Sequence, residues 1–187
     1  MMKMNKLMMS AAAAGSLAFA AELPIDQDHA AVTFSIPHMV VSRTKGAFTE
    51  FDGTLTVEDD KLTAVNAVIQ VKSIDTKNRR RDDHLRSDDF FDVENHPTMT
   101  FESTAVHADK IVGNLTIKGE TREVELNYTF KGPVTDPWGN VRFGFNADTT
   151  IDRTDFGLTW NQVVEAGAML VGEKVDITVS VEVIQGE

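Results

Sequence analysis

The chain has 187 residues, a formal net charge of −11 and no cysteine. The lack of cysteine excludes disulfides, cysteine nucleophiles and cysteine-ligated zinc, and the length suits a single domain. The excess of 29 acidic over 18 basic residues argues against binding to nucleic acids and against docking on anionic lipid head groups.

The N-terminal segment has the pattern of a signal peptide. Lys3 and Lys6 precede an apolar, alanine-rich run over residues 7–19, and Ala18-Phe19-Ala20 is a small-x-small cleavage motif. We therefore predict a signal peptide over residues 1–20, cleaved after Ala20, and an exported domain over residues 21–187. The run is too short to span a bilayer and no later segment is long and apolar enough, so we expect no stable membrane insertion.

Alternation of apolar and polar residues dominates the remaining chain and predicts about eight half-buried strands. The alternating sets lie at residues 32–36, 51–57, 65–71, 99–101, 111–117, 124–130, 141–151 and 175–183. Antiparallel strands with one apolar face each form a sandwich or close into a barrel, and the alternation alone does not choose between them.

Short segments between these sets predict turns. Lys118-Gly119-Glu120 and residues 58–61 are expected to form tight hairpins. Gly132-Pro133 and residues 136–140 are expected to mark a longer turn.

The first break in the alternation lies at residues 76–91. Thr76 is expected to cap a short helix that turns Leu85 inward. A second turn, capped by Ser87 or Asp88, is expected to present the two phenylalanines that follow.

The second break lies at residues 157–172 and is expected to be a loop. Just before it, Arg153 and Asp155 are expected to pair within the chain, with Gly157 relieving the turn.

Motifs of the common catalytic sites are absent from the sequence. It contains no nucleophile elbow, no zinc-protease helix and no glycine-rich phosphate loop, and its histidines are not paired at metal-binding spacing. Neighbouring carboxylates such as Asp82-Asp83 do not face each other on a helix. We predict no catalytic residue, no metal site and no required cofactor.

A charged segment at residues 79–86 admits two interpretations. Arg81, Asp82, His84 and Arg86 form either a structural ion-pair cluster that fastens the helix over one end of the fold, or a polar rim for a pyrophosphate, quinone or carboxyl head group. His38 and His84 each lie at a change from strand to loop near charged residues, where an imidazole suits a ligand head group.

The charged segment also carries a family pattern. Residues 73–101, with Asp82-Asp83-His84-Leu85, Phe90-Phe91 and His96-Pro97, resemble the signature of the YceI family. The segments at residues 113–119 and 151–157 are similar to later blocks of that family. The resemblance implies an all-β protein of the periplasm, an antiparallel lipocalin-like barrel of about eight strands with a short helical insert.

The resemblance also implies a function. Members of the family hold polyisoprenoid or other long-chain lipids in a hydrophobic tunnel, so a polyisoprenoid or an isoprenoid quinone is the expected ligand and a carrier or reservoir the expected role. By themselves the strand phenylalanines are explained by an ordinary core; the resemblance favours a tunnel lining. The candidate lining residues are Phe34, Phe51, Leu55, Phe91, Phe101, Leu115, Phe143 and Phe145.

The head-group candidates are His38, Arg81 and His84. Two other functions stay open: an enzyme that acts on an amphipathic substrate at the barrel mouth, and an accessory module for a membrane redox partner. The oligomeric state is also open, a homodimer included.

Overall fold

The computed structural model describes residues 20–164 and 167–185 of the chain. The predicted signal peptide, except for Ala20, lies outside these residues and stays a prediction. The elements are β1 (Ala21–His38), β2 (Ser42–Phe48), β3 (Phe51–Glu58), β4 (Lys61–Gln70), η1 (Val71–Ser73), β5 (Ile74–Asp75), α1 (Arg79–Arg86), β6 (Thr98–Val106), β7 (Lys110–Ile117), β8 (Glu120–Thr135), β9 (Val141–Asp152), η2 (Arg153–Phe156) and β10 (Lys174–Gln185).

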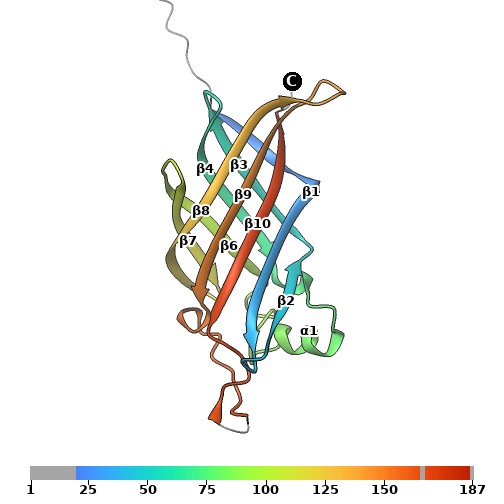
Figure 1. Ribbon diagram of the computed structural model, residues 1–187, viewed down its shortest axis with the longest axis vertical. Coiled ribbons are helices and arrows are strands. Elements are labelled where there is room, and N and C mark those ends of the chain that lie inside the picture. The colour runs from blue at the N-terminus through green and yellow to red at the C-terminus, as the bar shows by residue number, and fades with distance from the viewer. Residues whose placement is uncertain (1–19, 165–166, 186–187) are drawn as a thin grey trace, which may run out of the picture.

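The strands form a closed antiparallel barrel (Figure 1). Neighbouring strands follow the order β10-β9-β8-β7-β6-β4-β3-β1, and β1 also pairs with β10, which joins the two edges of the sheet. The strands β2 and β3 pair with successive halves of β1 and together fill one position in the ring. The prediction of about eight antiparallel strands is confirmed, and the closure selects the barrel over the sandwich.

The first strand is longer than the alternation predicted, and β2 was not predicted at all. A register shift between Asp26 and Ala30 interrupts the pairing of β1 with β10. A bulge of this kind breaks the period of two, which hides the N-terminal half of β1 in the sequence.

The two predicted tight hairpins are present. Lys118 and Gly119 join β7 to β8, and Asp59 and Asp60 join β3 to β4, all four with positive φ as in type I′ turns. The predicted role of Gly132-Pro133 was wrong: both residues lie inside β8, at a register shift opposite β9, and only residues 136–140 form the turn.

The short helix is present, but its predicted cap was wrong. Asn78 caps α1 by accepting a hydrogen bond from Arg81 N at 3.1 Å. Ser87 ends α1, and the predicted second turn follows it: Phe90 N donates to Ser87 O at 3.1 Å, and Phe90 and Phe91 border the cavity. The Ser87 hydroxyl bonds back to His84 O and does not cap this turn. Thr76 instead uses its backbone N–H to bind the buried carboxylate of Asp82 at 2.9 Å. Among the described residues, no helix is both long and apolar enough to cross a membrane.

Two groups of buried side chains fill the barrel interior. One group surrounds Leu55, Ile111 and Phe143 toward the end that carries the 136–140 turn. The other surrounds Val71, Ile74 and Phe156 toward the end that carries α1. The second group is the one that borders the helix and the 157–172 loop, so the two barrel ends differ in structure.

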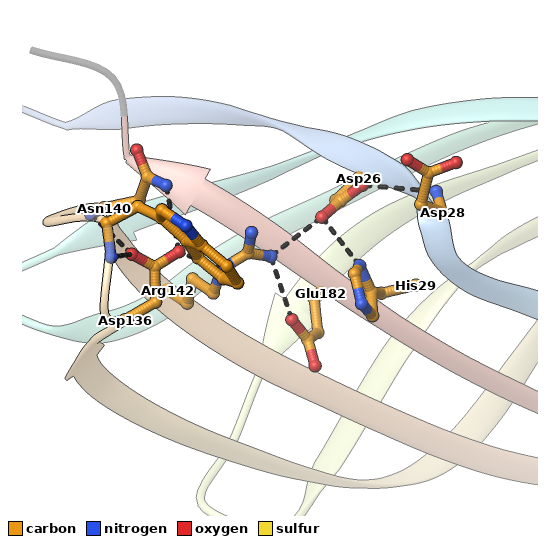
Figure 2. Close-up of polar contacts among 8 residues, drawn as sticks. Asp26, Asp28, His29, Asp136, Asn140, Arg142 and Glu182 are labelled. Carbon is orange, nitrogen blue, oxygen red and sulfur yellow. Dashed lines mark hydrogen bonds and ion pairs between the residues drawn. The ribbon is translucent and has the colours of Figure 1, made fainter.

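An ion-pair network on the outer surface ties β1, β9 and β10 together near the 136–140 turn (Figure 2). Arg142 Nε donates to Asp136 Oδ2 at 2.8 Å, and its Nη1 donates to Asp26 Oδ2 at 2.8 Å and to Glu182 Oε2 at 3.1 Å. His29 Nδ1 lies 3.0 Å from Asp26 Oδ2. We call these five residues the outer network.

Asp26, His29 and Glu182 lie close enough to one another to hold a metal ion. The Arg142 guanidinium already supplies a positive charge to both of these carboxylates. Since a second cation would be repelled at that position, we interpret the outer network as a structural tie.

The outer network should make stability depend on pH. Arg142, and to a lesser extent His29, lowers the pKa of Asp26, and Arg142 with Asn140 lowers the pKa of Asp136. Their contribution to stability is fully present above the unfolded-state pKa, about 4, and is lost as the pH falls through the lowered values.

We therefore expect Arg142→Met to lower the melting temperature strongly near neutral pH and less below about pH 4. Arg122→Met is the matched control, because its ion pair with Glu120 is half exposed and should contribute little. Thermal unfolding followed by circular dichroism measures both. A deficit of equal size at both pH values would contradict the assignment.

Candidate functional site

A cavity of about 620 Å³ lies inside the barrel. Its wall is formed by inward-facing side chains of the strands, and one end is bordered by α1, η2 and the 157–172 loop. This volume is within the range of small-molecule sites, about 300–1,000 Å³. The exposed residues Arg80 and Arg81 line the cavity, so it reaches the surface at this end, which we call the mouth.

All but one of the residues proposed as tunnel lining border this cavity. They are Phe34, Phe51, Leu55, Phe91, Phe101, Leu115 and Phe145. Phe143 is the exception and its predicted position was wrong. It points inward but stacks on Phe130, with ring centroids 5.3 Å apart, in the packed part of the barrel beyond the cavity. Whether any of these residues contacts a lipid stays a prediction.

Two glycines make room for rings in the cavity wall. A Cβ on Gly46 would lie 2.4 Å from Phe34 Cζ, and a Cβ on Gly113 would lie 2.5 Å from Phe101 Cζ. Each ring therefore covers the glycine on the neighbouring strand. These close approaches fix where the two phenylalanines stand in the wall.

The ionisable groups of the cavity lie at the mouth. Ionisable residues in its lining are His38, Arg80, Arg81, His84 and Arg153, and no acidic residue of the described chain contributes to it. Although the chain has more acidic than basic residues, the only ionisable groups beside the cavity in the described chain are arginines and histidines. The three predicted head-group residues are thus brought together, and Arg80 and Arg153 join them.

The charged helix is fastened mainly by hydrogen bonds to backbone, not by the predicted ion-pair cluster. Arg86 donates from Nε to Lys72 O at 2.8 Å and from Nη2 to Ile74 O at 2.7 Å. Arg81 donates to Thr76 at both Oγ1 and the carbonyl oxygen, at 2.7 and 2.8 Å. These bonds hold α1 across the barrel end and aim Arg81 at the mouth.

His84 connects the helix to the 157–172 loop. Its Nε2 lies 2.9 Å from Asp89 Oδ2, and its ring makes edge-to-face contacts with Phe90 and Trp160 at centroid distances of 5.0 and 4.8 Å. Trp160 was not among the predicted site residues. It is the only aromatic residue in the 157–172 loop, and that was the available signal.

Arg153 is the second missed residue, and its predicted pairing with Asp155 was wrong. The side chain is buried, with the residue 3% exposed, and Nε donates to Gly172 O at 2.8 Å while Nη1 donates to Leu158 O. Burial lowers the pKa of its guanidinium. The carboxylates of Glu173 and Asp152 offset part of this effect through space. Since its hydrogen bonds go only to carbonyl oxygens, the guanidinium can still attract an electronegative group in the cavity.

Comparison with known proteins agrees with this architecture. A model of the YceI-like domain matches residues 23–183. The chain belongs to the YceI family. A UPF0312 protein of Pectobacterium atrosepticum is 44% identical over 156 residues, which cover 79% of this chain and 81% of that protein. A UPF0312 protein of Staphylococcus epidermidis is 39% identical over 160 residues, 84% of this chain and 94% of the relative.

Solved structures share the barrel of this YceI-family protein. The Campylobacter jejuni YceI protein is 26% identical, with a TM-score of 0.68 over 81% of this chain and 91% of its own. BcnA of Burkholderia cenocepacia, 22% identical, has a TM-score of 0.72 over 84% and 98% of the two chains. A polyisoprenoid binding domain from Saccharophagus degradans, 13% identical, has a TM-score of 0.65 over 90% and 100%. The last two show the fold alone.

The bonds of Arg153 predict a cost on removal. Arg153→Met leaves buried carbonyl oxygens without donors and should lower the free energy of unfolding by about 1–3 kcal/mol. Asp155→Asn, at the partner expected from sequence, should change it by less than about 0.5 kcal/mol. Urea unfolding of both variants measures this. An equal loss of unfolding free energy in both variants would instead support an ion pair between Arg153 and Asp155.

Proposed function

We propose that this YceI-family protein binds one long-chain hydrophobic ligand, a polyisoprenoid or an isoprenoid quinone, with its chain in the barrel and its head at the mouth. The observation that carries the proposal is the division of the cavity: an apolar interior, and ionisable groups at one end only. A molecule with the same division, a long apolar chain and one polar end, complements it.

The interior supplies the affinity. Each methylene that leaves water for an apolar cavity contributes about 0.8 kcal/mol, so a long chain binds firmly without a strong polar contact. The wall contributes aromatic and branched side chains along the whole length, from Leu55 and Phe145 to Phe34 and Phe91.

The mouth supplies the orientation. Arg81 and His84 from α1, His38 from the end of β1, and Arg153 from η2 all border the same end of the cavity. Arginine and histidine donate hydrogen bonds, and among these four residues only His84 is paired with a carboxylate of the described chain, that of Asp89. A head group with oxygen acceptors, such as a quinone, phosphate or carboxyl group, fits these donors.

We assign the protein a place in the periplasm, after export by the N-terminal segment, and the role of carrier or reservoir for this lipid. Folding requires no metal or redox cofactor in this proposal. The fold neighbour named as a polyisoprenoid binding domain supports the ligand class. Family and cavity together favour a binding protein over an enzyme.

A fluorescence experiment tests the binding site. The two tryptophans lie apart, Trp160 in the cavity lining and Trp138 in the 136–140 turn, so Trp138→Phe makes Trp160 the only reporter. Adding a long-chain isoprenoid alcohol to this variant, stripped of lipid, should shift the Trp160 emission to shorter wavelength. Phe101→Gln in the same background should weaken binding by about tenfold or more, because a polar amide then faces the chain.

Phe130→Gln is the matched control. Phe130 is also a half-buried barrel phenylalanine, but it does not border the cavity. The control should keep the affinity of the parent protein. Equal binding by both folded variants, or no uptake of the alcohol by the parent, would contradict the site. Turnover of an amphipathic substrate that is lost in His84→Ala, with binding intact, would favour the enzyme instead.

A further inference from the structure

Exposed apolar side chains surround the mouth of the cavity. They come from the turn Met39-Val40-Val41 between β1 and β2 and from the loop that carries Val163 and Met169. Val40 is 83% exposed, Val41 79% and Val163 68%. We call these five side chains the apolar rim.

The two parts of the apolar rim lie side by side. Met39 N donates to Leu170 O at 2.9 Å, and His38 forms a β-bridge with Val171. His38, Leu170 and Val171 also line the cavity, so the rim adjoins its opening. In Figure 1 this loop projects beyond the barrel, at the end opposite the C-terminus.

The β1–β2 turn places two residues at positive φ that are unusual in such turns. Val41 N donates to His38 O at 3.2 Å, and the two residues between them, Met39 and Val40, have φ values of 50° and 63°. Asn-Gly or Asp-Gly suits such a turn, and a β-branched residue at positive φ is strained. Strained residues of this kind cluster at functional sites, and here they also expose apolar surface.

The charge distribution indicates what the apolar rim contacts. Residues 37–43 and 157–172 contain one acidic residue between them, Glu165, in a chain that has 29. The same two segments contain one basic residue, Arg43, so their formal charges cancel. Apolar tips with no net local charge suit a zwitterionic lipid surface, whereas the acidic body would be repelled by an anionic one.

We propose that the apolar rim docks the protein reversibly on a zwitterionic phospholipid surface, with the cavity mouth facing the lipid. This inference rests on the proposed function, because a water-insoluble chain passes most directly from a bilayer into a cavity that opens on it. Two projecting tips also suit a fluid surface better than the flat face that a second copy would need.

Co-sedimentation with vesicles of phosphatidylcholine and phosphatidylethanolamine tests the docking. The mature protein should pellet with the vesicles, and added salt should not release it, since apolar contacts are not screened. The double variant Met39→Asn, Val40→Gly should lose about tenfold or more of its vesicle affinity. Its melting temperature should stay the same or rise, because both new residues tolerate positive φ.

Trp138→Ser is the matched control. Trp138 is 82% exposed, but it lies in the turn at the opposite barrel end, so its loss should leave vesicle binding unchanged. An equal loss in the control, or no vesicle binding by the parent protein, would overturn the proposal. Dimerisation of the parent without vesicle binding, abolished in the double variant, would assign the rim to a second copy.

The isoprenoid-binding assay separates this inference from the proposed function. In the Trp138→Phe background, Trp160 reports ligand uptake without any vesicle present. Ligand uptake without vesicle docking would contradict the docking role of the apolar rim and leave the proposed ligand binding supported. Vesicle docking without ligand uptake would overturn the binding function and leave the membrane contact.

Discussion

The pairing of β1 with β10 is the interaction on which the rest of this structure depends. Without it the sheet would have two open edges and no enclosed space; with it, every inward-facing side chain borders one interior. The register runs from Ile25 opposite Val183 to Ser35 opposite Asp176, with one bulge, and the outer network lies across the same joint. Closure therefore creates the cavity, and the network reinforces the strand pair that closes it.

Closure also decides where polar groups can stand. Along the strands, polar side chains alternate outward and the interior stays apolar, so a charge reaches the cavity only from elements that cap the barrel. Those elements are α1, η2 and the end of β1, and they contribute the arginines and histidines of the mouth. The opposite end is filled by side chains such as Phe143 and Leu62. One end is packed and the other is open and basic, which gives the cavity a direction.

The apolar rim extends this direction beyond the protein. Its turn keeps Met39 and Val40 where Asn and Gly would fold more easily, and both side chains lie beside the residues that border the cavity opening. The same end thus combines an apolar outer surface, a basic mouth and an apolar interior. This is the order that an amphipathic lipid would meet on leaving a bilayer for the barrel.

Most strands could be predicted from sequence because one face of each is buried, which imposes a period of two on the residues. β2 escaped because its inward positions are Thr44, Gly46 and Phe48, and the glycine is there to admit the ring of Phe34. A strand shows the apolar–polar alternation only where its own side chains fill the interior. At Gly46 the ring of Phe34 from the neighbouring strand fills the space instead, so the pattern is lost.

The site was predicted less completely than the fold. Residues of the charged segment reach the mouth as expected, because α1 is short and fastened at both ends. Arg153 was assigned to its near neighbour Asp155, but η2 turns the side chain inward to carbonyl oxygens from Leu158 and Gly172. Contacts between distant segments leave no local pattern, so neither Arg153 nor Trp160 could be placed by spacing alone.

The most direct test of the central claim is native mass spectrometry of the mature protein isolated from its own host, followed by solvent extraction and lipid analysis. We expect one long-chain isoprenoid per protein, released when the barrel unfolds. A folded protein that is empty as isolated, and that refuses added isoprenoids, would contradict it.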